Sequence, residues 1–224
     1  MRYTVLACRE SPSLAVFVLH YSLKLIFMIS KKFDLNTTVL LLFIITTAGL
    51  RVAFNFSHEI LPLANFSPLG AMALFGGAYF NTKWKAFAFP LAMLFVSDFV
   101  LQQTVFKEYG NGFLYKGWYW VYGAFILMTI VGRTIKKVTI NRFLLSVVIC
   151  VFIHWIVTDL GMWIGSKRYS HDLGGFVTCL ENAIPFEWRF LAGTLIYGAI
   201  LFGLFEWFKR KYPTLQVSMM SRQF

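Results

Sequence analysis

Two aspartates interrupt apolar stretches of this sequence, and they are the residues best placed to do chemistry. Asp98 lies in LFVSDFVL, and Asp159 lies in HWIVTDLGMW, five residues after His154. An ionisable group inside a lipid bilayer is costly unless it is paired or used, so such residues often mark binding sites or ion pathways. We expect the two carboxylates to contact polar groups of a ligand or a counter-cation.

Further polar and aromatic residues are expected on the same side of the membrane as the two aspartates. Together they predict a cavity that opens to that face and is lined by carboxylate, amide, guanidinium and aromatic groups. Taken singly, each of these residues also has a structural explanation. Aromatic residues form belts at membrane interfaces, and an aspartate near a helix end can pair with an arginine. The predicted substrate-binding residues are Asp98, Asp159, Arg51, Asn65, Trp118, Trp155, Trp163, Glu181 and Asn182.

The composition indicates that membrane-spanning elements position these residues. The chain has 224 residues, of which 58% are hydrophobic and 14% charged, with a mean hydropathy of +0.65. Soluble domains carry about 25% charged residues. Open strands cannot span lipid, so the long apolar runs are predicted to be helices. We predict an all-α membrane protein whose six transmembrane helices cover 38–54, 67–81, 85–102, 117–135, 142–164 and 186–208.

The six predicted helices form one domain, residues 33–210, which is followed by a short tail at 211–224. Residues 1–32 are apolar and basic, and several interpretations remain open for them: a seventh span, a signal-like segment, an interfacial helix, or residues upstream of a true start at Met28. We favour the start at Met28, because MISKKFDLNTTVLLL has the short basic tail and following helix typical of a membrane protein.

The distribution of Lys and Arg predicts the orientation of the chain. The net charge is +11, and with six helices one side of the membrane receives about twice as many Lys and Arg residues as the other. Positive residues concentrate in cytoplasmic loops, so both ends of the six-helix core are predicted to be cytoplasmic. Glu181 and Asn182 then fall in an outer loop before the last helix.

The stretch ANFSPLGAMALFGGAYF predicts a short helix rich in small residues. Residues 67–80 make roughly 21 Å of helix, which is shorter than a hydrocarbon core of about 30 Å. Pro68 suits a first helical turn, and Ser67 or Asn65 is predicted to cap it. Small residues let helix backbones approach closely, either within the bundle or against a partner subunit. They are Gly70, Ala73, Gly76 and Gly77.

The sequence contains no recognisable catalytic or nucleotide-binding motif. GxxxxGK[ST], GxSxG and HExxH are absent, and the three cysteines and four histidines are scattered. We therefore expect no enzyme activity, no metal and no cofactor. The expected partners are membrane lipid and a small-molecule ligand, and not nucleic acid. A membrane-embedded enzyme that uses His154 and the two aspartates as acid and base groups is the weaker alternative.

The segments NFSPLGAMALFGGAYF, FPLAMLFVSDFVLQ, FIHWIVTDLGMW and ENAIPF resemble an uncharacterised family of bacterial integral membrane proteins over residues 33–208. More distantly, the layout resembles the substrate-binding S components of energy-coupling-factor vitamin transporters. This resemblance implies a six-helix fold in the bacterial cytoplasmic membrane, a vitamin-like ligand in an outward-facing pocket, and separate ATPase and coupling subunits. We therefore predict a substrate-binding transporter subunit, with a non-transporting membrane scaffold for a partner complex as the alternative.

Overall fold

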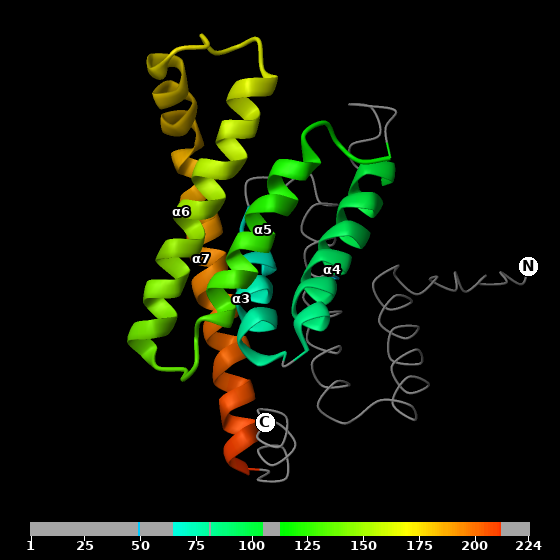
Figure 1. Ribbon diagram of the computed structural model, residues 1–224, viewed down its shortest axis with the longest axis vertical. Coiled ribbons are helices and arrows are strands. Elements are labelled where there is room, and N and C mark those ends of the chain that lie inside the picture. Colours follow the sequence, from blue (N-terminus) through cyan, green and yellow to red (C-terminus); the bar gives the residue numbers. More distant parts are fainter. Residues whose placement is uncertain (1–48, 50–64, 81, 105–112, 212–224) are drawn as a thin grey trace, which may run out of the picture. The chain divides into compact units, whose positions relative to one another are not determined.

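The described part of the chain is built from helices and their connections (Figure 1). The computed structural model describes residues 49, 65–80, 82–104 and 113–211. Five helices lie within these ranges, and no strand does: α3 (Leu69–Tyr79), α4 (Lys83–Thr104), α5 (Trp118–Arg133), α6 (Ile140–Gly165) and α7 (Leu173–Lys211). The predicted all-α class is confirmed for these residues. Segment 1–32, Arg51, the predicted helix at 38–54 except residue 49, and nearly all of the tail lie outside them, so a bundle of six helices stays a prediction.

Three of the five helices are long and apolar enough to cross a lipid bilayer. They are α4, with 22 residues, α6, with 26 residues, and α7, with 39 residues. A helix rises about 1.5 Å per residue, so about 20 residues span the hydrocarbon core. The three helices indicate a membrane protein.

Four predicted helices correspond closely to observed ones, whereas the last is far longer than predicted. The stretches 67–81, 85–102, 117–135 and 142–164 match α3, α4, α5 and α6 with ends displaced by about two residues. The predicted start at 186 is wrong, because α7 begins at Leu173. Glu181 and Asn182, which were expected in an outer loop, therefore lie on a helix.

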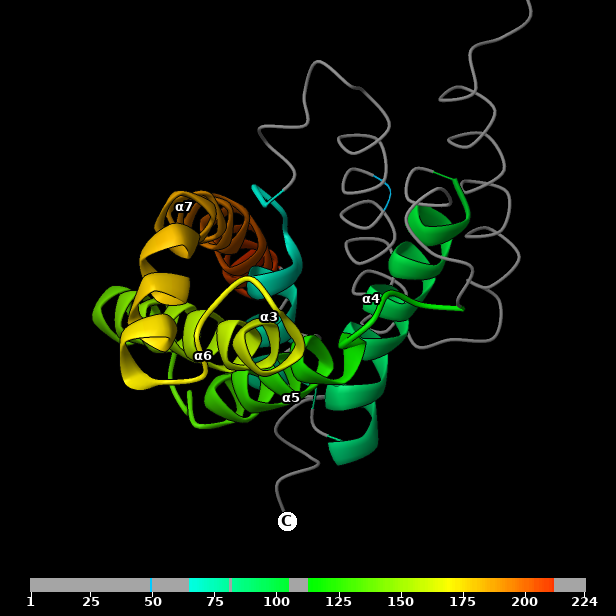
Figure 2. The same ribbon diagram turned by 90° about the horizontal axis from the view of Figure 1, so that it is seen from above.

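Pro185 explains why the start of α7 was misplaced. Proline favours the first turn of a helix, and the sequence places it directly before a strongly apolar run. In the structure Pro185 is inside α7, where it removes one backbone hydrogen bond and crowds the carbonyl four residues earlier. The segments before and after it differ in direction, as Figure 2 shows for the gold and the orange parts of α7. The chain stays helical because backbone groups left unpaired in lipid are costly.

The short helix α3 lies between α4, α5 and α7 and is buried on nearly every side (Figure 2). Phe75 packs edge-on against Phe202 and Phe205 of α7, with ring centroids 5.4 and 5.3 Å away. At its end, the Tyr79 hydroxyl donates a hydrogen bond of 2.7 Å to Glu206. A helix that is apolar all round is one that protein surrounds, so α3 is the central element of the described bundle.

The start of α3 differs from the predicted cap. The N-cap residue is Pro68, whose carbonyl accepts the Met72 N–H at 2.9 Å, and no side chain caps the helix. The backbone of Ser67 lies instead against α7, so close that a Cβ on Gly193 would be 2.8 Å from the Ser67 carbonyl oxygen. The side chain of Asn65 lines a cavity described below. Contacts with α7 therefore replace local capping.

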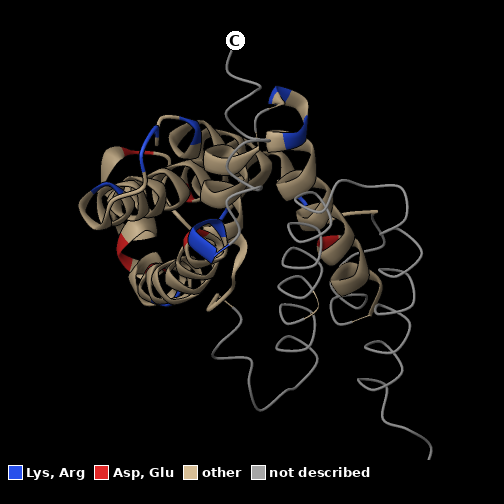
Figure 3. Cartoon of the chain, turned by 90° about the horizontal axis from the view of Figure 1, so that it is seen from below, with Lys and Arg blue, Asp and Glu red and all other residues tan. Residues whose placement is uncertain are grey.

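The segments that carry most of the described basic residues lie at one end of the described helices (Figure 1), and Figure 3 views the molecule from that end. The first turn of α4, the connection between α5 and α6, and the last turn of α7 lie at this end. The hydrogen bond between Tyr79 and Glu206 joins the end of α3 to the last turns of α7, and α4 begins directly after α3. The basic residues in these segments, and in the adjoining ends of α5 and α6, are Lys83, Lys85, Arg133, Lys136, Lys137, Arg142, Lys209, Arg210 and Lys211.

Candidate functional site

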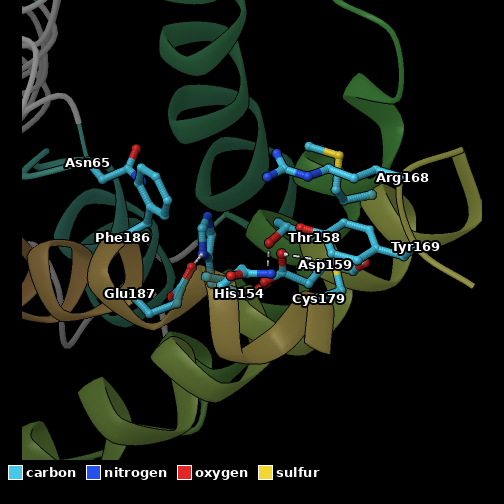
Figure 4. Close-up of a pocket in the computed structure, with 12 residues that line it drawn as sticks. Asn65, His154, Thr158, Asp159, Arg168, Tyr169, Cys179, Phe186 and Glu187 are labelled. Atoms are coloured by element: carbon cyan, nitrogen blue, oxygen red, sulfur yellow. Dashed lines mark hydrogen bonds and ion pairs between the residues drawn. The ribbon is translucent and has the colours of Figure 1, made fainter. Parts of the chain in front are cut away.

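A polar cavity of about 480 Å³ lies between α6 and α7 (Figure 4). The segment before α3 and the connection between α6 and α7 complete its wall. The lining residues are Asn65, His154, Thr158, Asp159, Met162, Arg168, Tyr169, Cys179, Asn182, Ala183, Phe186 and Glu187. The cavity therefore brings together two carboxylates, an imidazole, a guanidinium and two amides.

Helical periodicity explains which residues reach the cavity. His154, Thr158 and Met162 follow one another at intervals of four on α6. Cys179, Ala183 and Glu187 do the same on α7. Residues four apart share one face of a helix, so each helix turns one continuous stripe toward the cavity. The small Ala183 between the two longer side chains leaves space there.

His154 and Glu187 form the most deeply placed polar pair of the cavity. The Nδ1 atom of His154 lies 2.8 Å from Oε1 of Glu187, and the Glu187 side chain is 9% exposed. The imidazole also stacks on the Phe190 ring, with centroids 4.1 Å apart and planes inclined by 18°. Two contacts of different kinds therefore hold the ring in place. The pair is an ion pair whenever the imidazole is protonated.

Each carboxylate of the cavity retains capacity to accept hydrogen bonds. Oε2 of Glu187 is buried and has no hydrogen-bond partner among the described residues. Within the described residues, the donor to the Asp159 carboxylate is the Cys179 thiol, with Sγ 4.0 Å from Oδ1, and thiols are weak donors. An unsatisfied buried acceptor costs about 1–3 kcal/mol, more when charged, so a donor or cation that entered the cavity would be stabilised there.

The connection between α6 and α7 forms the far side of the cavity with Arg168 and Tyr169 (Figure 4). Its shape depends on local hydrogen bonds, since Trp163 Nε1 donates to the Ser170 carbonyl at 2.8 Å. Asp172 ends the connection, and its Oδ1 accepts the Gly175 N–H at 2.6 Å and the Ser170 hydroxyl at 2.9 Å. These bonds favour the carboxylate, so they lower the pKa of Asp172, with the Gly175 N–H as the larger cause.

Three of the predicted binding residues lie together in this cavity: Asn65, Asp159 and Asn182. Arg51 lies outside the described residues, and the others lie elsewhere. Asp98 is buried on α4, where Oδ2 accepts a hydrogen bond of 3.4 Å from the Tyr115 hydroxyl. Glu181 is exposed on α7.

The predicted tryptophan wall is not part of the cavity. Trp118 is 41% exposed at the start of α5, and Trp163 holds the connection. Trp155 lines an apolar groove outside the cavity, and its Nε1 donates to the Leu180 carbonyl at 3.1 Å. The aromatic side chains that do line the cavity are Tyr169 and Phe186.

Glu187 is the residue that sequence reasoning missed. Glu187 lies in the last predicted helix, 186–208, and is not among the predicted binding residues. The repeat of Cys179, Ala183 and Glu187 at intervals of four was the available signal, and it is visible only when α7 is taken to start early. No group of three or more metal-binding side chains occurs in the part of the chain that the structure describes.

The small residues of α3 face the chain's own helices. A Cβ on Gly70 would lie 2.8 Å from the Phe190 ring of α7, and one on Gly76 would lie 2.7 Å from the Pro90 ring of α4. A Cβ on Gly77 would be 2.9 Å from the Cα of Gly132 on α5. Ala73 is fully buried. These residues therefore permit close packing inside the described bundle.

Comparison with known proteins places the chain in a family. Residues 31–215 match the model of DUF6580, a family of unknown function. The chain belongs to this family. The DUF6580 match contains every described helix and the whole cavity. No curated protein matches the chain, and no solved structure does.

Proposed function

We propose that the protein binds a small polar, vitamin-like solute in the cavity between α6 and α7 and serves as the substrate-binding subunit of a membrane transporter. The solute carries a positively charged or hydrogen-donating group that meets Asp159 and Glu187. The observation that carries the proposal is that both carboxylates line one cavity while each still has an oxygen able to accept a hydrogen bond.

The size and lining of the cavity support a small ligand. Its volume of about 480 Å³ lies within the range of about 300–1,000 Å³ usual for small-molecule sites. Asn65 and Asn182 add amide groups that can both donate and accept, which suits a solute with several polar atoms. Phe186 and Met162 supply apolar surface beside them. This mixture of a few convergent polar groups and apolar walls is typical of specific binding sites.

The finer parts of the proposal rest on the sequence. The layout of the six predicted helices, with polar residues on the outer side, resembles that of S components, which implies that the cavity faces outward and that both ends of the core are cytoplasmic. Because the sequence has no P-loop, the proposal takes the energy for transport from separate ATPase and coupling subunits. The protein itself then binds and releases solute without changing it.

The decisive experiment is to identify a ligand that co-purifies with the protein. Unaltered protein, Asp159→Asn and Glu187→Gln are purified in mild detergent, and small molecules extracted from each are compared by mass spectrometry. We expect one polar compound to be carried by the unaltered protein and lost from both variants. When the compound is added back, its Kd should rise about tenfold or more, because a hydrogen bond to a charged group is worth about 1.5–3 kcal/mol.

Glu181→Gln is the matched control for Glu187→Gln. It makes the same chemical change on the same helix, but Glu181 is exposed and does not line the cavity. The control should retain the compound. The proposal is wrong if no compound is bound more tightly by the unaltered protein than by the two cavity variants, or if the control loses the compound equally.

The contact between His154 and Glu187 favours an enzyme as the second candidate function. A histidine held by a carboxylate has the parts of a general acid–base pair. The two candidates differ in what happens to the co-purified compound during incubation with the protein. A transporter subunit leaves it unchanged, whereas an enzyme converts it at a rate that falls in His154→Gln.

A further inference from the structure

Another concave surface, distinct from the polar cavity and from the groove at Trp155, lies between α6 and α7, close to the basic end of the described helices. It is an apolar groove of about 610 Å³, separate from the polar cavity. Phe143 and Leu144 line it from α6, and Ile196, Phe202 and Gly203 line it from α7. Leu144 is 45% exposed and Ile196 is 50% exposed, so the groove is open along its length.

Among the described residues that line the groove, the one charged group, Glu206, is already paired with its neighbours. Glu206 Oε1 accepts hydrogen bonds from the Tyr79 hydroxyl at 2.7 Å and from Lys209 Nζ at 2.9 Å. The carboxylate is therefore paired within the protein, and it does not repel an anion that approaches the groove.

Two cations adjoin the groove-lining residues in sequence at the basic end, one before α6 and one near the end of α7. Lys137 directly precedes Val138, which lines the groove from the connection between α5 and α6. Arg210 is four residues after Glu206, so it continues the groove face of α7 by one turn. Both residues are exposed, and within the described residues neither terminal cationic group has a partner.

The length of the groove corresponds to one leaflet of a bilayer. The residues that line it on α7 run from Leu195 to Glu206, about 16 Å of helix. Half of a hydrocarbon core of about 30 Å is about 15 Å. We propose that the groove binds an anionic phospholipid, with an acyl chain along the apolar floor and the phosphate between Lys137 and Arg210.

The test measures which phospholipid the protein retains. Purified protein is reconstituted in vesicles of equal parts phosphatidylglycerol and phosphatidylcholine, re-extracted gently, and analysed by native mass spectrometry. We expect phosphatidylglycerol to be retained in preference. Each cation near an anionic lipid raises the affinity for that lipid about fivefold. The preference for phosphatidylglycerol should therefore fall roughly tenfold or more in the double variant Lys137→Gln, Arg210→Gln. Added salt should also weaken it.

The control removes two charges at the same end but away from the groove. Lys83→Gln with Lys85→Gln changes α4, which does not line the groove, and this double variant should keep the preference. Gly203→Phe fills the groove, and because no atom of the described residues lies within 4 Å of a Cβ there, the fold should accept it. Both lipids should then be retained less. Equal retention of the two lipids by the unaltered protein, or an unchanged preference in the Lys137 and Arg210 variant, overturns the proposal.

Discussion

Asp172 shows how a single side chain sets the start of the longest helix. Its carboxylate accepts the Gly175 N–H and so satisfies one of the free amides in the first turn of α7. The same oxygen accepts the Ser170 hydroxyl, which ties the connection to the helix. Because both donors favour the charged form, the pKa of Asp172 is lower in the folded chain than in the unfolded one.

This pKa predicts how the first turn of α7 responds to acid. A carboxyl whose pKa is lowered by folding stabilises the fold above its unfolded value of about 3.9 and ceases to do so as the pH falls through the folded value. We expect residues 172–176 to lose hydrogen-exchange protection, corrected for intrinsic rates, below about pH 4. Asp172→Ala should show the same loss at pH 7. A pH-independent exchange pattern that Asp172→Ala does not alter would contradict this role.

The site residues could be predicted only in part. The sequence shows which residues have functional side chains, but not which of them contact one another in the fold. Asp159 was found from its charge within an apolar run. Its weak partner, Cys179, and the pairing of His154 with Glu187 depend on the register between α6 and α7, which no short sequence pattern specifies. Asp98 has the same sequence signature as Asp159 but lies on α4 and not in the cavity.

At the scale of elements, the crossing of α3 and α5 requires two glycines. A Cβ on Gly77 would collide with the Thr129 carbonyl oxygen, and one on Gly132 would collide with the Leu74 carbonyl oxygen. These neighbours are backbone atoms, which cannot rotate away as a side chain can. The crossing therefore depends on the absence of side-chain atoms at both positions.

The crossing makes a quantitative prediction for Gly77→Ala. Overpacking a close contact costs about 1–3 kcal/mol and sometimes more, so we expect this variant to lose about 3 kcal/mol of stability, measured as a lower Tm in detergent. Gly123→Ala on α5 is the control, because no atom in the described part of the chain lies within 4 Å of its Cβ position. The control should be neutral, or stabilising by up to about 1 kcal/mol. Similar Tm values for the two variants would show that the helices do not pack this closely.

Helix ends could be predicted where an apolar run is bounded by polar, glycine or aromatic residues. The start of α7 could not be predicted, because a proline lies inside that helix. The limits of α4, α5 and α6 follow from runs of apolar residues bounded by Lys, Arg, Gly or aromatic residues. Pro185 has two structural meanings, a first turn or a break within a helix, and the sequence around it fits both. Packing of Ala183 and Glu187 against α6 decides between them.

At the scale of the whole molecule, the basic end predicts how the chain is oriented. The first turn of α4, the connection between α5 and α6 and the end of α7 carry most of the described Lys and Arg residues (Figure 3). The positive-inside rule assigns such an end to the cytoplasm. We therefore predict that the connection between α6 and α7, with the polar cavity beside it, faces outward.

Cysteine labelling tests this orientation. In a variant whose three native cysteines are replaced by alanine, Lys167→Cys should react with a membrane-impermeant maleimide on intact cells. Lys136→Cys should react only after the cells are permeabilised. Both positions are exposed, so neither result depends on burial. The native Cys179 cannot serve as the reporter, because it is 1% exposed on α7. The reverse labelling pattern would invert the orientation.

The central position of α3 has a consequence for biosynthesis. Its 11 residues make roughly 16 Å of helix, too little to span a bilayer alone. Yet α3 leaves the ribosome before α5 and α7, the helices that enclose it, and its contacts with Phe202 and Phe205 join residues more than a hundred positions apart. The insertion machinery must therefore accommodate α3 before α5 and α7, the helices against which it packs, have been synthesised. The bundle closes around α3 only when α7 emerges, so completion of the last helix commits the whole chain to its fold.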